Sequence, residues 1–144
     1  MIDGLACAIL ARVAFEDLRR FRIRNFWVAV LTGLFVVSVV LGLRPSALWH
    51  VAFAGAALAL MFAVFALRWI GAGDAKLIVA ACLWVGPAAS SVFAAALLTA
   101  ALIYVAGAKL KLLPARCMDG RLTIPFGPSI ASAWILTIIV SHSI

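Results

Sequence analysis

The sequence predicts an all-α integral membrane protein, a single domain over residues 1–144 in which six transmembrane helices form a bundle. Two observations predict this class. Of the 144 residues, 67% are apolar and 12% are charged, whereas soluble domains are roughly 45 to 50% apolar. The chain also contains several uncharged runs near the roughly 20 residues that a helix needs to cross the hydrocarbon layer. So few polar side chains cannot cover a water-facing surface, which excludes a separate soluble domain.

Four of the expected spans are plain and two are weaker. Lys, Arg, Asp and Glu are absent from residues 26–43, 47–67, 88–108 and 128–144, the last being slightly short. Residues 2–15 are apolar apart from Asp3 and Arg12, and residues 75–85 form a short run between a glycine cluster and Gly86-Pro87. Counting these two weaker runs gives six spans.

The positive charges between the runs alternate along the chain. The loops hold four, one, two, none and four Lys or Arg in order, with Lys76 counted in the third loop, and none follows the last run. Positive residues in short loops mark the cytoplasmic side of a membrane protein. The alternation therefore predicts that both termini lie outside and that the first, third and fifth loops face the cytoplasm. We call this the inner side.

The formal net charge is +7. In a soluble chain this balance suggests nucleic acid as a partner, but basic residues in the loops of a membrane protein bind anionic lipid headgroups instead. We therefore expect membrane lipids as partners and no nucleic acid. The three cysteines form no C-x-x-C pair, and His50 and His142 have no ligand spacing, so we expect no metal.

Four of the five acidic residues lie on the expected inner side, and two of them are candidates for a site. Asp17 closes the first span just before the arginines, and Asp74 opens the fourth within Gly71-Ala72-Gly73-Asp74-Ala75-Lys76. Because a helix rises only 1.5 Å per residue, residues 75–85 are too few to cross the bilayer, so Asp74 is expected partly below the headgroups. Ionisable groups at such depth usually face the bundle interior or a water-filled cavity.

Each aspartate has a structural interpretation and a catalytic one. Asp74 could be the N-cap of its helix, where a carboxylate accepts a backbone N–H. Asp17 could be a solvated acid paired with the nearby arginines. If the two meet, however, they cannot both ionise easily, and one keeps a proton. The ionised member then activates a water while the protonated member polarises a peptide carbonyl, which is aspartic-protease chemistry and requires no cofactor.

Three motifs resemble those of one family. Gly71-Ala72-Gly73-Asp74-Ala75-Lys76 is similar to the G-x-G-D-x-K box of the type IV prepilin peptidases, membrane aspartic proteases that trim pilin precursors. Asp17 with the downstream Ile23-Arg24-Asn25 resembles the family's first aspartate and its Ile-Pro-Asn. Residues 124–130, Ile-Pro-Phe-Gly-Pro-Ser-Ile, resemble the family's Pro-Phe-Gly-Pro-Ala-Ile before the last span. The three motifs occur in the family's order.

The chain departs from the family at two points. Arg24 stands where the family has proline, which bears on the turn into the second span but not on the carboxylate. Residues 18–25 leave no room for the insertion with paired C-x-x-C motifs that longer members carry for zinc binding and N-methylation. The chain therefore resembles the short, peptidase-only branch that serves tight-adherence (Flp) pili, and no methyltransferase activity is expected.

The resemblance implies a GxGD-type aspartic endopeptidase of the bacterial inner membrane, multi-pass, with Asp17 and Asp74 as the catalytic pair. Its substrate would be a prepilin or pseudopilin, cut at the cytoplasmic face after a small residue, usually glycine. Six residues are expected to shape the site or bind substrate: Gly71, Gly73, Lys76, Pro125, Phe126 and Gly127. Lys76 either neutralises the site or shapes it, and residues 125–128 form either the turn into the last span or a wall of the substrate groove.

Two other functions compete with this interpretation. A small proton- or cation-coupled transporter would use either aspartate as an ion carrier, although no inverted repeat or paired broken helices support it. A non-catalytic membrane subunit of a pilus or secretion apparatus would keep its function after either aspartate is replaced by asparagine. The pilin that is cut, the protonated aspartate and the oligomeric state are left open.

Overall fold

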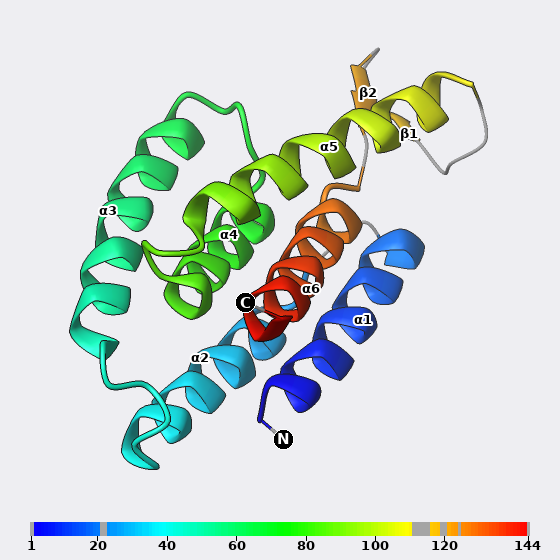
Figure 1. Ribbon diagram of the computed structural model, residues 1–144. Coiled ribbons are helices and arrows are strands. Elements are labelled where there is room, and N and C mark those ends of the chain that lie inside the picture. The colour runs from blue at the N-terminus through cyan, green and yellow to red at the C-terminus, as the bar shows by residue number, and fades with distance from the viewer. Residues whose placement is uncertain (1, 21–22, 111–115, 119–120, 124, 144) are drawn as a thin grey trace.

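The computed structural model is built from helices and one short hairpin (Figure 1). It describes residues 2–20, 23–110, 116–118, 121–123 and 125–143. In these ranges the elements are α1 (Ile2–Arg20), α2 (Asn25–Val40), α3 (Ala47–Ala66), α4 (Ala72–Val85), α5 (Ser90–Lys109), β1 (Arg116–Met118), β2 (Arg121–Thr123) and α6 (Gly127–Ser143). The predicted all-helical fold with six helices is confirmed.

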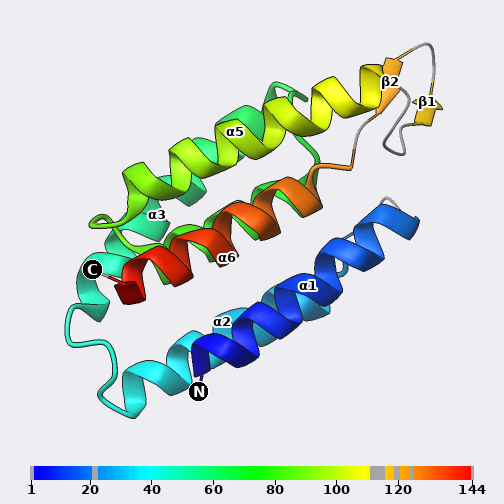
Figure 2. The same ribbon diagram turned by 45° about the vertical axis from the view of Figure 1, so that its right-hand side comes forward.

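Four helices form a ring and two flank it. α1 packs against α2 and α6, and α4 packs against the same two helices, so these four enclose the core. α3 packs along α4, and α5 packs along α6, on the outside of the ring. Figure 2 shows α5, α6 and α1 as three neighbouring rods. We call the end at which α1, α3 and α5 end, and α2, α4 and α6 begin, the inner end, after the side that the loop charges predict.

Each helix of the ring turns one apolar face inward. Leu10, Leu31, Leu77 and Trp134, one from each of the four helices, are fully buried in a shared cluster. Trp84 of α4 joins this cluster, and its Nε1–H donates to the carbonyl of Leu31 over 2.9 Å. Apolar contacts and this buried hydrogen bond therefore hold α2 and α4 in position relative to each other.

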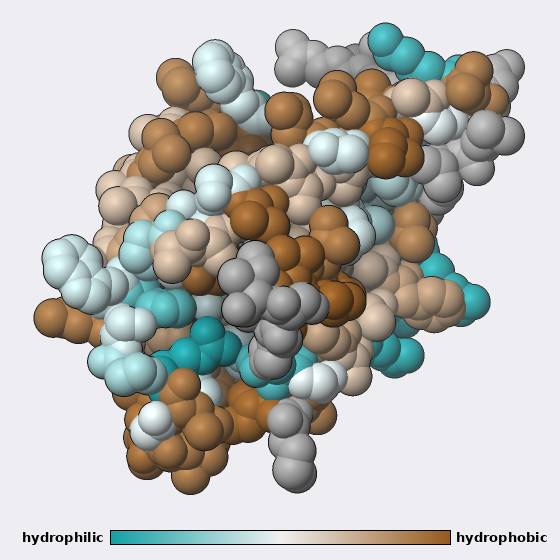
Figure 3. All heavy atoms as spheres, viewed as in Figure 1, coloured by the Kyte–Doolittle hydropathy of each residue, from teal (hydrophilic) through white to brown (hydrophobic). Residues whose placement is uncertain are grey.

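The flanking helices are apolar on the outside. α3 and α5 are long and apolar enough to cross a membrane, whereas α2 and α6 are apolar but shorter. α3 buries only Ala54 among its residues and exposes large side chains such as Leu48 and Phe62. Figure 3 shows hydrophobic residues over much of the visible face. An apolar surface of this extent is typical of a protein surrounded by lipid.

The helix ends differ from the expected spans where the chain turns. α1 continues past Phe15 to Arg20, and α4 begins at Ala72 rather than at residue 75. Both extensions carry the candidate aspartates into helices. α2 ends at Val40, ahead of the expected residue 43, because the chain turns at Gly42, whose φ of 71° suits glycine.

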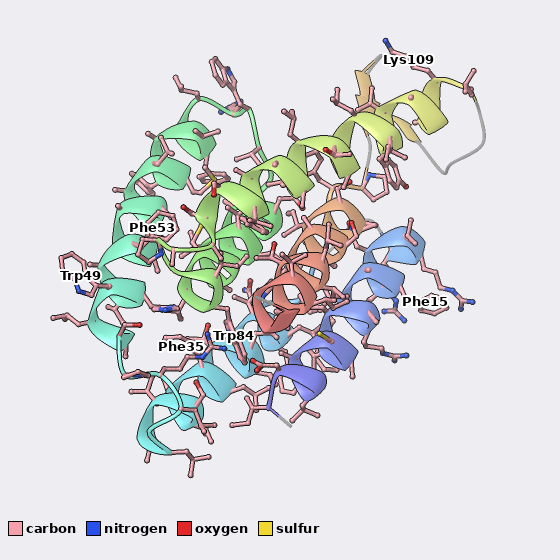
Figure 4. All side chains as sticks on the ribbon, viewed as in Figure 1. Phe15, Phe35, Trp49, Phe53, Trp84 and Lys109 are labelled. Carbon is pink, nitrogen blue, oxygen red and sulfur yellow. The ribbon has the colours of Figure 1, made fainter. Side chains whose placement is uncertain are left out.

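A polar cluster joins the helices at the outer end. Arg44 donates to the carbonyl of Trp84 over 3.0 Å and pairs with Asp3 over 3.0 Å, and its guanidinium lies over the Trp84 ring. Nδ1 of His50 lies 2.9 Å from the carbonyl oxygen of Leu83. Figure 4 shows Trp84 beside Phe35 of α2. These contacts tie the α2–α3 connection to α1 and α4.

The fifth loop contains a hairpin that the sequence analysis treated only as a loop. β1 and β2 pair antiparallel, with Cys117 opposite Leu122. Between them the sequence reads Asp-Gly, a dipeptide typical of two-residue hairpin turns. Asp119 of that dipeptide, one of the four inner acidic residues, lies outside the described residues.

Candidate active site

Asp17 lies on the buried face of α1. It continues the series Ala6, Leu10 and Val13, whose spacing of three or four residues places all of them on one side of the helix. Only 4% of Asp17 is exposed. The interpretation of Asp17 as a solvated acid paired with arginines is therefore wrong: its side chain is turned into the bundle.

The carboxylate of Asp17 meets the beginning of α6. The backbone N–H of Gly127, the first residue of that helix, donates to Asp17 Oδ2 over 2.9 Å. The first N–H groups of a helix lack intrahelical partners and carry its positive dipole end, so they favour a negative charge there. A side chain at residue 127 would not fit, since an added Cβ would lie 2.6 Å from the same oxygen.

The Pro-Phe-Gly-Pro segment therefore has a structural role. Gly127 lets the backbone approach Asp17, and Pro128, one residue further on, suits a first helical turn where a missing N–H costs nothing. This supports the interpretation of residues 125–128 as the turn into the last helix. Pro125 and Phe126 also line the cavity described below, and their interpretation as a wall of a substrate groove stays a prediction.

Asp74 lies in the first turn of α4 without capping it. The N-cap is Gly71, with extended φ and ψ of −72° and 147° and no side-chain capping bond. The interpretation of Asp74 as the N-cap is therefore wrong. The glycines of the motif leave room around it: an added Cβ would lie 3.3 Å from Asp74 Oδ2 at Gly71 and 3.2 Å from the Cβ of Ile23 at Gly73.

Both aspartates line one cavity of about 1800 Å³ at the inner end of the bundle. Its walls come from the inner ends of α1, α2, α3 and α4 and from the chain before α6. The negative charge of Asp17 is one of the causes that raise the pKa of Asp74 within this cavity. The structure therefore brings together the two residues that the sequence analysis proposed as a pair.

The environment treats the two aspartates differently. Both aspartates lie outside the apolar runs of residues 2–15 and 75–85, next to the inner end of each run. Burial raises the pKa of Asp74, and the negative charge of Asp17 raises it further. Burial also raises the pKa of Asp17, but the hydrogen bond from Gly127 acts in the opposite direction and lowers it. The N–H of Gly127 thus favours the ionised form of Asp17. The negative charge of Asp17 favours the protonated form of Asp74.

Lys76 connects two of the motifs. Its Nζ donates to Asn25 Oδ1 over 3.1 Å, which ties the beginning of α4 to the beginning of α2. Lys76 also lines the cavity. Between the two roles left open for it, this contact favours shaping the site.

Arg24, which stands where the resemblance has proline, has a backbone conformation that a proline could also adopt. It is the N-cap of α2 with φ of −79°, within the range near −65° that a proline ring imposes. Its guanidinium lies 3.9 Å from the carboxylate of Glu16. The substitution therefore adds an ion pair at a position whose backbone suits either residue.

Glu16 is a site residue that the sequence analysis missed. It lines the cavity beside Asp17, and its carboxylate accepts a 2.7 Å hydrogen bond from Trp27 Nε1. Its position next to Asp17 at the end of α1 was the available signal. Cations line the same cavity: Arg20, Arg24, Arg68 and Lys76.

The described residues contain no group of three or more His, Cys, Asp or Glu side chains that could hold a metal ion. What the cavity contains instead is a pair of buried carboxyl groups in different environments, Asp17 beside the N–H of Gly127 and Asp74 beside the charge of Asp17. Such a pair can activate a water and polarise a carbonyl.

Comparison with known proteins gives one match. The family model described as the type IV leader peptidase family matches residues 4–108, a range that includes Asp17 and Asp74. No curated protein and no solved structure matches the chain significantly.

Proposed function

The chain belongs to the type IV leader peptidase family, and from that premise we propose that it is an integral membrane aspartic endopeptidase that removes the leader from prepilins of the Flp type. The family indicates a peptidase with a prepilin-type substrate. The observation that carries the aspartic mechanism is the single cavity lined by both Asp17 and Asp74. The chemistry as proposed uses no cofactor, and residues 18–25 contain none of the C-x-x-C motifs from which a methyltransferase activity would be proposed.

The contacts of the two carboxyl groups assign their roles. Asp17, held by the N–H of Gly127 at the positive end of α6, is the anion and removes a proton from water. Asp74 is the acid and donates a hydrogen bond to the scissile carbonyl oxygen. The water oxygen bonds to the carbonyl carbon, the proton of Asp74 passes to the carbonyl oxygen, and a tetrahedral diol forms.

The diol then collapses to products. The C–N bond breaks, the leaving nitrogen takes the proton that Asp17 received, and Asp74 recovers its proton from the diol hydroxyl. Atoms and charges balance, because the net reaction adds one water across the peptide bond. The site returns to its starting state with Asp17 ionised and Asp74 protonated.

The proposed setting is the bacterial inner membrane, with six spans and the cavity at the cytoplasmic face. Two observations support this orientation. Four arginines lie in the last turn of α1 and between α1 and α2, and the cavity lies at the same end of the bundle. Figure 4 shows Lys109 at this inner end and Trp49 at the opposite end. The basic loops would hold the protein against anionic lipid rather than attract a basic leader.

The test is co-expression with a candidate Flp-type prepilin while the size of the precursor is followed. We expect Asp17→Asn and Asp74→Asn each to abolish cleavage at unchanged protein level, and Asp3→Asn, an acid at the outer end, to retain it. Cleavage that survives in one of the two variants would remove that residue from the mechanism. Cleavage in neither the wild type nor any variant, with altered ion flux, would favour a transporter instead.

A further inference from the structure

α2 and α3 are consecutive helices that both pack on α4 but do not pack along each other. They approach at the outer end, where the rings of Phe35 and His50 are 5.8 Å apart. From there they diverge toward the inner end (Figure 1). In the described part of the chain α3 packs along α4 and not along α2, and the cavity described above occupies the space between the inner ends of α2 and α3 beside α4. We call this space the gap.

The gap is part of the cavity that the aspartates line. Phe26 at the beginning of α2 and Phe65 at the end of α3 both line this cavity, together with Val64. Phe26 is 59% exposed and Phe65 is 45% exposed. One cavity thus extends from the two carboxyl groups to the apolar surface of two membrane helices.

The cavity has a mixed lining. Asp17 and Asp74 come from α1 and α4, whereas Phe26, Val64 and Phe65 are the apolar side chains that α2 and α3 contribute. The four cations lie on all sides, because Arg20 belongs to α1 and Lys76 to α4, while Arg24 directly precedes α2 and Arg68 follows α3. A fully polar peptide would leave Phe26 and Phe65 without apolar contacts, and an acyl chain alone would leave the carboxyl groups and the cations without partners. The lining suits a polypeptide with a polar segment next to an apolar helix.

We propose that the gap between the inner halves of α2 and α3 is the docking surface for the apolar helix of the substrate, which leads its cleavage site to Asp17 and Asp74. This inference rests on the proposed function and specifies where the substrate enters. α4 packs against both α2 and α3 and forms the floor of the gap, while α2 and α3 form its sides. Phe26 and Phe65 contact the first turns of the docked helix.

The test is photo-crosslinking in membranes, with the substrate held uncut by Asp74→Asn. Benzoylphenylalanine is placed at residue 26 or 65, and at the control positions 98 and 102 of α5, where Leu98 and Leu102 are 63% and 62% exposed. We expect residues 26 and 65 to crosslink to the apolar helix of the prepilin, and residues 98 and 102 to lipid. Equal crosslinking from α5, or lipid adducts alone from 26 and 65, would overturn the proposal.

A second measurement uses the active enzyme. Phe65→Ala should raise KM for the full-length prepilin about tenfold with little change in kcat, because a large apolar contact is lost. Leu98→Ala, a truncation of a similarly exposed side chain, should change neither. An unchanged KM in Phe65→Ala would contradict docking in the gap. Failure of the catalytic proposal is a separate result, since it would appear as cleavage by Asp74→Asn.

Discussion

Replacing Gly127 by alanine tests how closely the beginning of α6 holds Asp17. The new Cβ would lie 2.6 Å from Asp17 Oδ2 and 3.0 Å from both its Cβ and its Cγ. An ordinary contact between such atoms is about 3.5 Å or more. The carboxylate must therefore retreat by about 1 Å, which lengthens the 2.9 Å hydrogen bond from residue 127 beyond bonding distance.

Two consequences follow from that displacement. Overpacking of a well-packed site costs about 1 to 3 kcal/mol of stability. The loss of a hydrogen bond to a charged group contributes in the same direction. A misplacement of about 1 Å in a catalytic group lowers the rate about 100-fold. We therefore expect Gly127→Ala to fold with lowered stability and to cleave prepilin with kcat/KM reduced about 100-fold.

The assay is cleavage of purified prepilin in detergent, with thermal unfolding measured on the same samples. Matched glycine-to-alanine controls give a graded series. Gly71→Ala and Gly73→Ala meet atoms at 3.3 and 3.2 Å and should have smaller effects, whereas Gly33→Ala, with nothing within 4 Å, should have none. Wild-type cleavage by Gly127→Ala would refute the positioning of Asp17 by α6.

The remaining predictions concern pH and two contacts outside the acidic pair. The pKa of Asp74 is raised by burial and by Asp17. Its contribution to the free energy of unfolding is therefore largest at pH values below the usual aspartate pKa, and it is lost as the pH rises through the raised pKa. Asp74→Asn should therefore unfold at a higher temperature than wild type at neutral pH and at a similar temperature near pH 4; a constant difference across that range would contradict this. The pH dependence of kcat/KM should be bell-shaped, falling at low pH as Asp17 is protonated and at high pH as Asp74 ionises, and Asp3→Asn should leave the profile unchanged. A rate that stays constant up to pH 9 would exclude an acid role for Asp74. Lys76→Ala removes the hydrogen bond to Asn25 and should lower kcat/KM several-fold, whereas Lys76→Gln, which can still donate, should recover part of it; equal losses in both would indicate that charge is what matters. Arg44→Ala removes the bonds to Asp3 and to the Trp84 carbonyl and should cost about 1 to 2 kcal/mol of stability with cleavage retained, as measured by chemical unfolding.

Much of the fold could be predicted from local composition. Uncharged runs in the sequence predicted α2, α3, α5 and α6, because a helix that crosses a membrane needs about 20 residues with few charges among them. The extension of α1 to Arg20 was less visible, since a charged inner end resembles a loop in a composition scan. The hairpin was missed although its Asp-Gly dipeptide is a turn signal.

The candidate site could be predicted in part. The buried spacing of Asp17 with Leu10 and Val13 was readable from helical periodicity. Its contact with Gly127 was not, because 110 positions separate the two residues and tertiary packing alone brings them together. The N-cap interpretation of Asp74 failed because capping preferences are local, whereas Gly71 caps the helix and leaves Asp74 to line the cavity. The gap between α2 and α3 depends on which helices pack against α4, which no local pattern records.

Infrared difference spectroscopy of the carboxyl groups tests the central claim most directly, because a protonated carboxyl and a carboxylate absorb at different frequencies. The account predicts one protonated carboxyl whose titration is shifted to higher pH than that of an ordinary aspartate. Its band should be absent from Asp74→Asn and should titrate at lower pH in Asp17→Asn, where the neighbouring anion is gone. Identical carboxyl titrations in the wild type and both variants would contradict a proton held by Asp74 beside an ionised Asp17.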